Sequence, residues 1–183
     1  AQITFRANFD DIKIGSSVAV NGVCLSITKI ENNIFSADIM KETLNLTNLK
    51  TLKRGSVINL ERAMSANSRF EGHIVSGHID TVAAVENITK EGFSKRIEFC
   101  CNNDLIVKKG SIAINGVSLT VTNIIKDGFE VSLIPETIKN TNLSELKIND
   151  IVNIEYDILG KYIQKFISPK KEITLEFLKE NGF

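Results

Sequence analysis

Residues 115–122 read Asn-Gly-Val-Ser-Leu-Thr-Val-Thr, and residues 21–28 read Asn-Gly-Val-Cys-Leu-Ser-Ile-Thr. The match continues at a constant offset of 94 without a gap: 17 of the 44 positions in residues 18–61 are identical to their counterparts in residues 112–155. A repeat of this length is a whole domain rather than one unit of a solenoid. The chain of 183 residues therefore holds two small domains of one fold.

Both repeats contain short runs in which apolar and polar residues alternate, which predicts strands with one buried face. Turn signals such as Asn21-Gly22 and Asn115-Gly116 separate these runs. Short strands with regular turns are typical of a β-sandwich or a closed barrel. The alternating runs begin at Ile3, Val18, Phe35, Ile97, Ile112 and Phe129.

Three segments depart from this alternation. Residues 43–53 and 137–147 have apolar spacing closer to that of a helix, so we expect a short helix or a loop in each. Residues 158–167 have the spacing of an amphipathic helix, which Ser168-Pro169 should end, and a second helix is expected at about residues 173–179. The tail has no counterpart in the first repeat and can serve oligomerisation or pack on its own chain.

Composition excludes several classes of protein. The 22 basic residues balance the 22 acidic ones without a block of one sign, which argues against a nucleic-acid groove. No segment is long and apolar enough to cross a membrane, and the first residues lack the apolar run of a signal peptide. Three cysteines form neither a disulfide framework nor a spaced metal motif, so we expect a cytoplasmic protein.

We expect domains at residues 1–73 and 74–168, and a helical tail at residues 169–183. The counterpart of Gly77 would fall before Ala1. The first domain is therefore expected to lack its N-terminal strand.

These motifs together resemble the riboflavin synthase family over the whole chain. The resemblance rests on six segments in order along the sequence: residues 21–26, 40–44, 72–78, 115–121, 134–137, and the tail with Gly160-Lys161-Tyr162 and residues 176–183. It implies an all-β fold of two tandem six-stranded Greek-key barrels, related by pseudo-twofold symmetry, with a C-terminal α-helical tail. It also implies a homotrimer built through the tail helix, in which a first barrel meets the second barrel of a neighbour, and an association with lumazine synthase.

The resemblance further implies a transferase that needs no cofactor or metal. In this reaction two molecules of 6,7-dimethyl-8-ribityllumazine dismutate by transfer of a four-carbon unit, giving riboflavin and 5-amino-6-(D-ribitylamino)uracil. Donor and acceptor are the same compound, so two related pockets suit the chemistry. Positioning of two rings, exclusion of water and modest acid–base help are the expected contributions of the protein.

Cys24 and Ser118 occupy the same position of the two repeats. By residue type alone, a small residue fits a tight strand after a turn. The resemblance instead makes each a wall or a nucleophile of its pocket, and the difference between thiol and hydroxyl could separate donor from acceptor.

The two histidines and the Glu-Thr pairs can each be interpreted as structural or as part of the site. Glu42-Thr43 and Glu136-Thr137 are suited to cap a helix, whereas the resemblance places them along the ligand. A single histidine is usually structural, but the resemblance puts His78 at the pocket as a proton shuttle, with His73 behind it.

For three further positions, the residue type alone does not decide between a structural and a functional role. Lys109 is a surface lysine or a ligand contact, and Asp157 caps the tail helix or takes part in catalysis. Many family members have Asp where this chain has Asn115, which we interpret as a turn residue. Adjacent Cys100 and Cys101 point to opposite faces of a strand, so we expect packing roles rather than a bridge.

The resemblance assigns catalytic roles to Cys24, His78, Ser118 and Asp157. It assigns substrate contacts to both repeats: Cys24, Leu25, Ser26, Asp38, Ile39, Met40, Lys41, Glu42, Thr43, Gly77, His78, Ile79, Lys109, Ser118, Leu119, Thr120, Leu133, Ile134, Pro135, Glu136, Thr137 and Ile138.

Two other functions compete with the enzyme. One is a lumazine or flavin carrier that has lost catalysis, which should show one decayed repeat, whereas both repeats keep Asn-Gly-Val and Glu-Thr. The other is a tandem barrel that binds single-stranded nucleic acid. The chain has only two tyrosines and no tryptophan, so it offers few aromatic side chains on which bases could stack.

Overall fold

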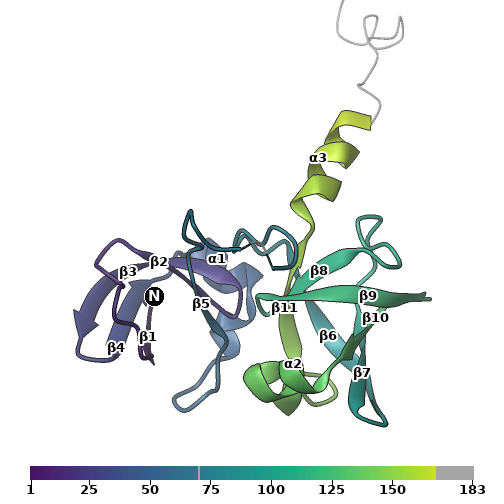
Figure 1. Ribbon diagram of the computed structural model, residues 1–183, viewed down its shortest axis with the longest axis horizontal. Coiled ribbons are helices and arrows are strands. Elements are labelled where there is room, and N and C mark those ends of the chain that lie inside the picture. The colour runs from purple at the N-terminus through teal and green to yellow at the C-terminus, as the bar shows by residue number, and fades with distance from the viewer. Residues whose placement is uncertain (70, 168–183) are drawn as a thin grey trace, which may run out of the picture.

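The computed structural model describes residues 1–69 and 71–167 and contains two β repeats side by side (Figure 1). The first repeat is a five-stranded sheet in the order β1-β4-β3-β2-β5. Its strands are β1 Gln2–Arg6, β2 Ser17–Val20, β3 Val23–Glu31, β4 Ile34–Asp38 and β5 Leu60–Arg62. The predicted tandem all-β fold is confirmed.

The second repeat is a closed six-stranded barrel in the order β10-β7-β6-β11-β8-β9, with every pair antiparallel. Its strands are β6 Thr81–Glu91, β7 Ser94–Cys100, β8 Ser111–Ile114, β9 Val117–Ile125, β10 Gly128–Leu133 and β11 Ile151–Tyr156. The offset of 94 residues maps β7 to β11 onto β1 to β5, in order. β6 alone has no counterpart among the described residues of the first repeat.

The missing counterpart of β6 leaves the first repeat open. β6 joins β7 to β11 in the second repeat, whereas in the first repeat no described strand joins β1 to β5. A cavity of about 1010 Å³, lined by β1 and residues 52–58 among others, occupies this opening. The expectation of six strands therefore holds for the second repeat, and the first has five.

Each repeat has its own apolar core, and the two cores correspond. The rings of Phe5 and Phe35 stack with centroids 5.9 Å apart, and their repeat equivalents Phe99 and Phe129 stack at 5.4 Å. All four side chains are buried, so the alternation read from the sequence is borne out on these strands. Ile79, from the stretch between the repeats, packs against the first core.

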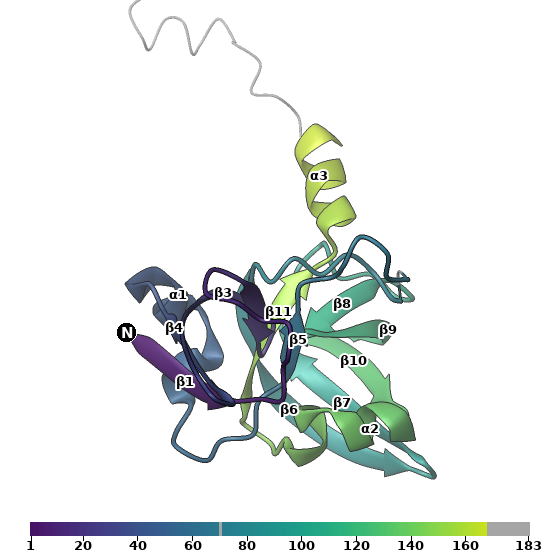
Figure 2. The same ribbon diagram turned by 60° about the vertical axis from the view of Figure 1, so that its left-hand side comes forward.

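The helical segments lie close to where the sequence predicts them. In each repeat a short helix and a 3₁₀ turn come after β4 or its equivalent β10. The tail forms one helix that projects away from both repeats (Figures 1 and 2). These elements are α1 Lys41–Leu46, η1 Asn48–Thr51, α2 Pro135–Asn140, η2 Asn142–Glu145 and α3 Ile158–Ile167. The helix expected near residues 173–179, and the tail assigned to residues 169–183, lie outside the described residues.

The two repeats meet back to back at their Asn-Gly turns. Asn21 and Asn115 adopt the left-handed conformation with φ of 46° and 47°, which confirms the turn role of Asn115. A β-carbon added at Gly22 would lie 2.6 Å from the backbone nitrogen of Gly116. Only glycine permits this approach, so the pseudo-twofold axis passes between these two residues.

Six asparagines, three from each repeat, surround that contact and form the inter-repeat interface: Asn21, Asn48 and Asn59, with their equivalents Asn115, Asn142 and Asn153. The side-chain amide of Asn48 donates to Asn115 Oδ1 at 3.0 Å, and that of Asn142 donates to Asn21 Oδ1 at the same distance. The backbone N–H of Asn48 donates to Asn153 Oδ1 at 2.7 Å, and that of Asn142 donates to Asn59 Oδ1 at 2.8 Å. The repeated hydrogen bonds show the pseudo-twofold symmetry directly and hold the two repeats in register.

Candidate active site

The inter-repeat interface positions Cys24 and Ser118, each two residues beyond its glycine contact. Cys24 begins β3 with Val23 and is exposed, whereas Ser118 lies at the same place in β9 and is half-buried. Both strands continue directly from a rigid turn. The repeat therefore places a thiol and a hydroxyl at equivalent points on either side of one axis.

The connecting segment, residues 72–80, contacts both of these positions. Gly77 lies against Cys24: the Cys24 N–H donates to the Gly77 carbonyl at 2.9 Å, and a β-carbon at Gly77 would lie 2.5 Å from Cys24 Cβ. At its other end, a β-carbon at Gly72 would lie 2.9 Å from Ser118 Oγ. Both glycines have positive φ, so the segment needs glycine there for conformation as well as space.

Glu155 anchors the connecting segment to the second barrel. Its carboxylate, almost fully buried, accepts hydrogen bonds from the Ser76 N–H, the Ser76 hydroxyl and the Gly77 N–H. Beyond them, Asp80 accepts the N–H of Tyr156 at 2.8 Å. A buried carboxylate requires such partners, so this contact fixes Gly77 against Cys24.

His73 lies against Ser118, with 2.8 Å between its Nδ1 and the Ser118 hydroxyl oxygen. Burial lowers the pKa of His73, and the charges of Asp157 and Glu155 oppose that shift. The Nε2 atom is buried without a hydrogen-bond partner in the described structure. Sequence reasoning put His73 behind the pocket; the available signal was the Gly-His pair that occurs at both 72–73 and 77–78.

His78, the histidine we expect to shuttle protons, is exposed. Within the described ranges it makes no hydrogen bond or ion pair, although the neighbouring Gly77 touches Cys24. His78 is therefore near the first-repeat position and open to a ligand. Its role stays a prediction.

Asp157 caps the tail helix. Its Oδ1 accepts the N–H of Leu159 at 3.0 Å, in the manner of an N-terminal cap. The same carboxylate is close enough to influence the pKa of His73. Both readings of Asp157 are therefore compatible with its place.

The strand ends assigned to the ligand lead into α1 and α2 in both repeats. Met40 and Ile134 are exposed, whereas Ile39 and Leu133 point into the cores, as does Leu25. For these three core residues only the backbone can reach a ligand. The remaining residues of this group have exposed or half-buried side chains: Asp38, Lys41, Glu42, Thr43, Pro135, Glu136, Thr137 and Ile138.

The Glu-Thr pairs do not supply side-chain caps. Met40 and Ile134 hold the N-cap positions, and neither helix start has a side-chain capping hydrogen bond. Glu42 and Glu136 lie in the first turns, where a negative charge is favourable to the helix dipole. The prediction that the Glu-Thr side chains cap these helices is therefore wrong, because neither pair makes a capping hydrogen bond. Both glutamate side chains are exposed.

The other assigned residues lie on β3, on β9 and in the turn before β8, and Leu119 packs against the second core. Ser26 and Thr120 are exposed, Leu119 is half-buried, and exposed Lys109 has a φ of 69°. Cys100 is exposed and Cys101 is half-buried, with its sulfur 3.6 Å from the Tyr156 hydroxyl. All three cysteines are free.

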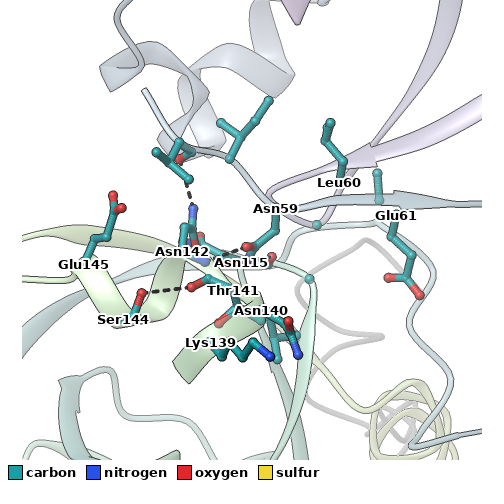
Figure 3. A pocket seen from close by; sticks show the side chains of 16 residues that line it. Asn59, Leu60, Glu61, Asn115, Lys139, Asn140, Thr141, Asn142, Ser144 and Glu145 are labelled. Atoms are coloured by element: carbon teal, nitrogen blue, oxygen red, sulfur yellow. Dashed lines mark hydrogen bonds between the residues drawn. The ribbon is translucent and has the colours of Figure 1, made fainter. Parts of the chain in front are cut away.

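Two cavities of the described structure do not contain the proposed catalytic residues. One cavity of about 410 Å³ lies at the inter-repeat interface, where Figure 3 shows Asn59, Asn115 and Asn142 close together. The other is the opening beside β1. Cys24, Ser118, His78 and Asp157 line neither cavity; Cys24 and His78 are exposed, and Ser118 and Asp157 are half-buried.

Residues 1–69 and 71–167 offer neither a metal site nor a membrane-spanning helix. No group of three or more His, Cys, Asp or Glu side chains there could hold a metal ion. No helix there is long and apolar enough to cross a membrane.

Comparison with known proteins identifies both repeats. The Lumazine binding domain family matches residues 1–63 and 76–157. Riboflavin synthase of Actinobacillus pleuropneumoniae is 47% identical over 194 residues, which cover 100% of this chain and 90% of that protein. Riboflavin synthase of Bacillus subtilis (strain 168) is 44% identical over 95% of this chain and 85% of that protein.

Solved structures of LumP share the fold. The crystal structure of LumP complexed with 6,7-dimethyl-8-(1'-D-ribityl) lumazine matches with a TM-score of 0.72 at 28% identity, covering 79% of both chains. The crystal structure of LumP complexed with riboflavin matches with a TM-score of 0.73 at 29% identity, covering 79% of this chain and 80% of that one.

Proposed function

Because this chain belongs to the riboflavin synthase family, we propose that each of its two repeats holds one lumazine molecule, and that a single dismutation pairs the molecule on the first repeat of one chain with the molecule on the second repeat of a neighbouring chain. The chain is a riboflavin synthase, a transferase that moves a four-carbon unit between two molecules of 6,7-dimethyl-8-ribityllumazine. The products are riboflavin and 5-amino-6-(D-ribitylamino)uracil.

One observation carries the proposal for the site. The connecting segment touches the same position of both repeats, with Gly77 against Cys24 and Gly72-His73 against Ser118. Equivalent positions with different side chains suit two copies of one ligand in different roles. We therefore assign one lumazine to the face around Cys24 and His78 and the other to the face around Ser118 and Asp157.

The remaining ligand contacts follow the strand ends. Backbone groups at residues 38–40 and 133–135 are placed to read the polar edge of a heterocycle, since Ile39 and Leu133 turn their side chains into the cores. Exposed Glu42 and Glu136, with Thr43 and Thr137, are suited to the ribityl hydroxyls. Ser26, Thr120 and Lys109 complete the two faces.

We propose a homotrimer held by α3. Its apolar residues Leu159, Tyr162, Ile163, Phe166 and Ile167 are exposed, with Phe166 81% and Ile167 75% accessible. An apolar face of this kind is normally covered. Of the proposed catalytic residues, Cys24 and His78 are also exposed, and a neighbouring chain would cover them.

The trimer is tested by sedimentation and turnover of two variants. Phe166→Glu should give smaller particles and lose riboflavin formation, because charge is added to the apolar face. Lys165→Glu, on the polar side of the same helix, is the matched control and should stay assembled. A fully active Phe166→Glu monomer would refute a site shared between chains.

Two further expectations stay predictions. A cytoplasmic location is supported by the three free cysteines, which persist in a reducing compartment. Association with lumazine synthase rests on the family resemblance alone.

The direct test of function uses the purified full-length protein and the lumazine without metal or nucleotide. Riboflavin absorbance should appear, and 5-amino-6-(D-ribitylamino)uracil should form in equal amount. A lumazine or flavin carrier is the alternative, since LumP, which is similar to this chain, was solved in complex with the lumazine and with riboflavin. A carrier would bind the lumazine with a change of fluorescence and form no riboflavin.

The asymmetry of the site is tested by Cys24→Ser and Ser118→Ala, made separately. The two variants should lower kcat to different extents if the repeats hold donor and acceptor. Equal effects would contradict distinct roles for the two faces.

A further inference from the structure

The contact between His73 and Ser118 has no counterpart at Cys24. Ser118 Oγ lies 2.8 Å from an imidazole nitrogen. The backbone N–H of Cys24 donates to the carbonyl of Gly77, and no histidine hydrogen-bonds the Cys24 thiol in the described structure. The hydroxyl of the second repeat is therefore held by a side chain, and the thiol of the first repeat is not.

The local backbone is shaped for this contact. Gly72 has a φ of 117° and leaves no room for a side chain, because a β-carbon there would lie 3.2 Å from Ser118 Cβ and 2.9 Å from Ser118 Oγ. A glycine immediately before the histidine lets the main chain pass close over β9. This is a built contact between segments 45 residues apart, not a chance encounter of two surface side chains.

The far side of the imidazole is also informative. Nε2 is buried and has no hydrogen-bond partner among residues 1–69 and 71–167, although a buried polar atom normally has one. The charged groups that act on this ring are Asp157 and Glu155. An unpaired buried nitrogen beside a proposed catalytic hydroxyl marks the ring as part of the site rather than of the core.

We propose that His73 is a positioning residue, which holds the Ser118 hydroxyl in one orientation toward the lumazine bound at the second repeat. This rests on the proposed function of the Ser118 face. A neutral imidazole has one N–H and one acceptor nitrogen, so it fixes whether Ser118 offers a proton or a lone pair to the ligand. Such a device acts in one repeat only and makes two otherwise equivalent faces different.

The first experiment is a double-mutant cycle in the full chain. His73→Leu removes the hydrogen bond and should lower kcat roughly tenfold, the effect of losing about one hydrogen bond, with a smaller change in lumazine affinity. His73→Asn should restore most of the rate, because its amide is as many bonds from Cα as Nδ1 is. Added to Ser118→Ala, His73→Leu should have almost no further effect, whereas independent multiplicative losses would overturn the proposal.

The second experiment needs no turnover. In ¹⁵N NMR spectra of the full chain, Ser118→Ala should change the Nδ1 shift of His73, and Cys24→Ser should leave it unchanged. An unchanged Nδ1 shift in Ser118→Ala would overturn the contact, and so the proposal. If the wild type forms no riboflavin, or Ser118→Ala is too slow to assay, this measurement decides the question and separates failure of the inference from failure of the proposed function.

Discussion

The two repeats agree most closely where they touch each other and differ where chemistry is proposed. Asn-Gly, Thr-Asn-Leu and Asn-x-Glu occur in both, and their asparagines and glycines build the inter-repeat interface. Cys24 stands where the second repeat has Ser118, and Ala63 stands where it has Asp157. The residues that are identical in the two repeats therefore mainly build their shared interface. The residues that differ lie where we propose different roles for the two lumazine molecules.

The repeats differ again in closure. β6 completes the second barrel, and the segment before it covers Glu155 with three hydrogen bonds. The first repeat is open between β1 and β5, and its equivalent carboxylate, Glu61, accepts no hydrogen bond in the described structure. The same sequence position thus has a different environment in each half.

The largest expected effect comes from Gly22→Ala. The new methyl group would lie 2.6 Å from the Gly116 backbone, at a φ of 78° that disfavours alanine. Strain and overpacking together should cost about 3 kcal/mol or more of unfolding free energy. Urea denaturation of both proteins measures the change.

Gly55→Ala is the matched control. Gly55 has a φ of 89° and nothing within 4 Å of the added carbon, so only the conformational term remains, about 1–2 kcal/mol. The difference between the variants gives the contribution of the glycine contact. Equal losses would show that the repeats can move apart at little cost.

Local patterns in the sequence predicted most of the fold. Phe5, Phe35, Phe99 and Phe129 occupy inward positions of alternating strands, and all four are buried. The helix at residues 158–167 also follows from spacing alone. Periods of 2 and 3.6 residues determine which face is apolar, so these elements need no knowledge of distant contacts.

The inter-repeat interface and the His73 contact could not be read in the same way. Asn48 meets Asn153 over 105 residues, and His73 meets Ser118 over 45. The asparagine pair has no local signature, because an asparagine in a turn and one at an interface look alike in a sequence. The Gly-His pair at residues 72–73 draws attention to His73 but does not indicate its partner. The offset of 94 showed which residues are equivalent, but it did not show that the equivalent residues cross over and bind one another.

The second prediction compares Asn153→Ala with Asn59→Ala. Asn153 is fully buried, donates to both Asn21 O and Asn48 Oδ1, and accepts the N–H of Asn48. Its loss leaves several buried groups unpaired and should cost about 3 kcal/mol. Asn59 is half-buried, and its loss should cost about 1 kcal/mol.

Thermal unfolding at one protein concentration measures both variants. A larger loss for Asn59→Ala would mean that the first repeat, although open, carries more of the interface. A conservative Asn153→Asp variant retains the acceptor for Asn48 and removes the amide donor. It therefore separates the contribution of the Asn153 side chain as an acceptor from its contribution as a donor.

The third prediction concerns the two equivalent carboxylates. Glu155→Gln replaces one acceptor oxygen with a donor that faces the N–H groups of Ser76 and Gly77. It should lower the unfolding free energy by about 1–3 kcal/mol. It should also loosen Gly77 from Cys24, which faster amide exchange at Cys24 would report.

Glu61→Gln should have the smallest effect, and its sign should be opposite. Burial raises the pKa of Glu61, so the folded chain holds this proton more tightly than the unfolded chain. The stabilising contribution is complete below the unfolded pKa, about 4.3, and is lost as pH rises through the higher folded value. Glutamine carries no such charge, so the variant should be slightly more stable than the wild type at pH 7 and lose that advantage near pH 4. A difference that is the same at both pH values would show that ionisation of Glu61 in the open repeat has no energetic consequence, and that its environment differs from that of Glu155 only in geometry.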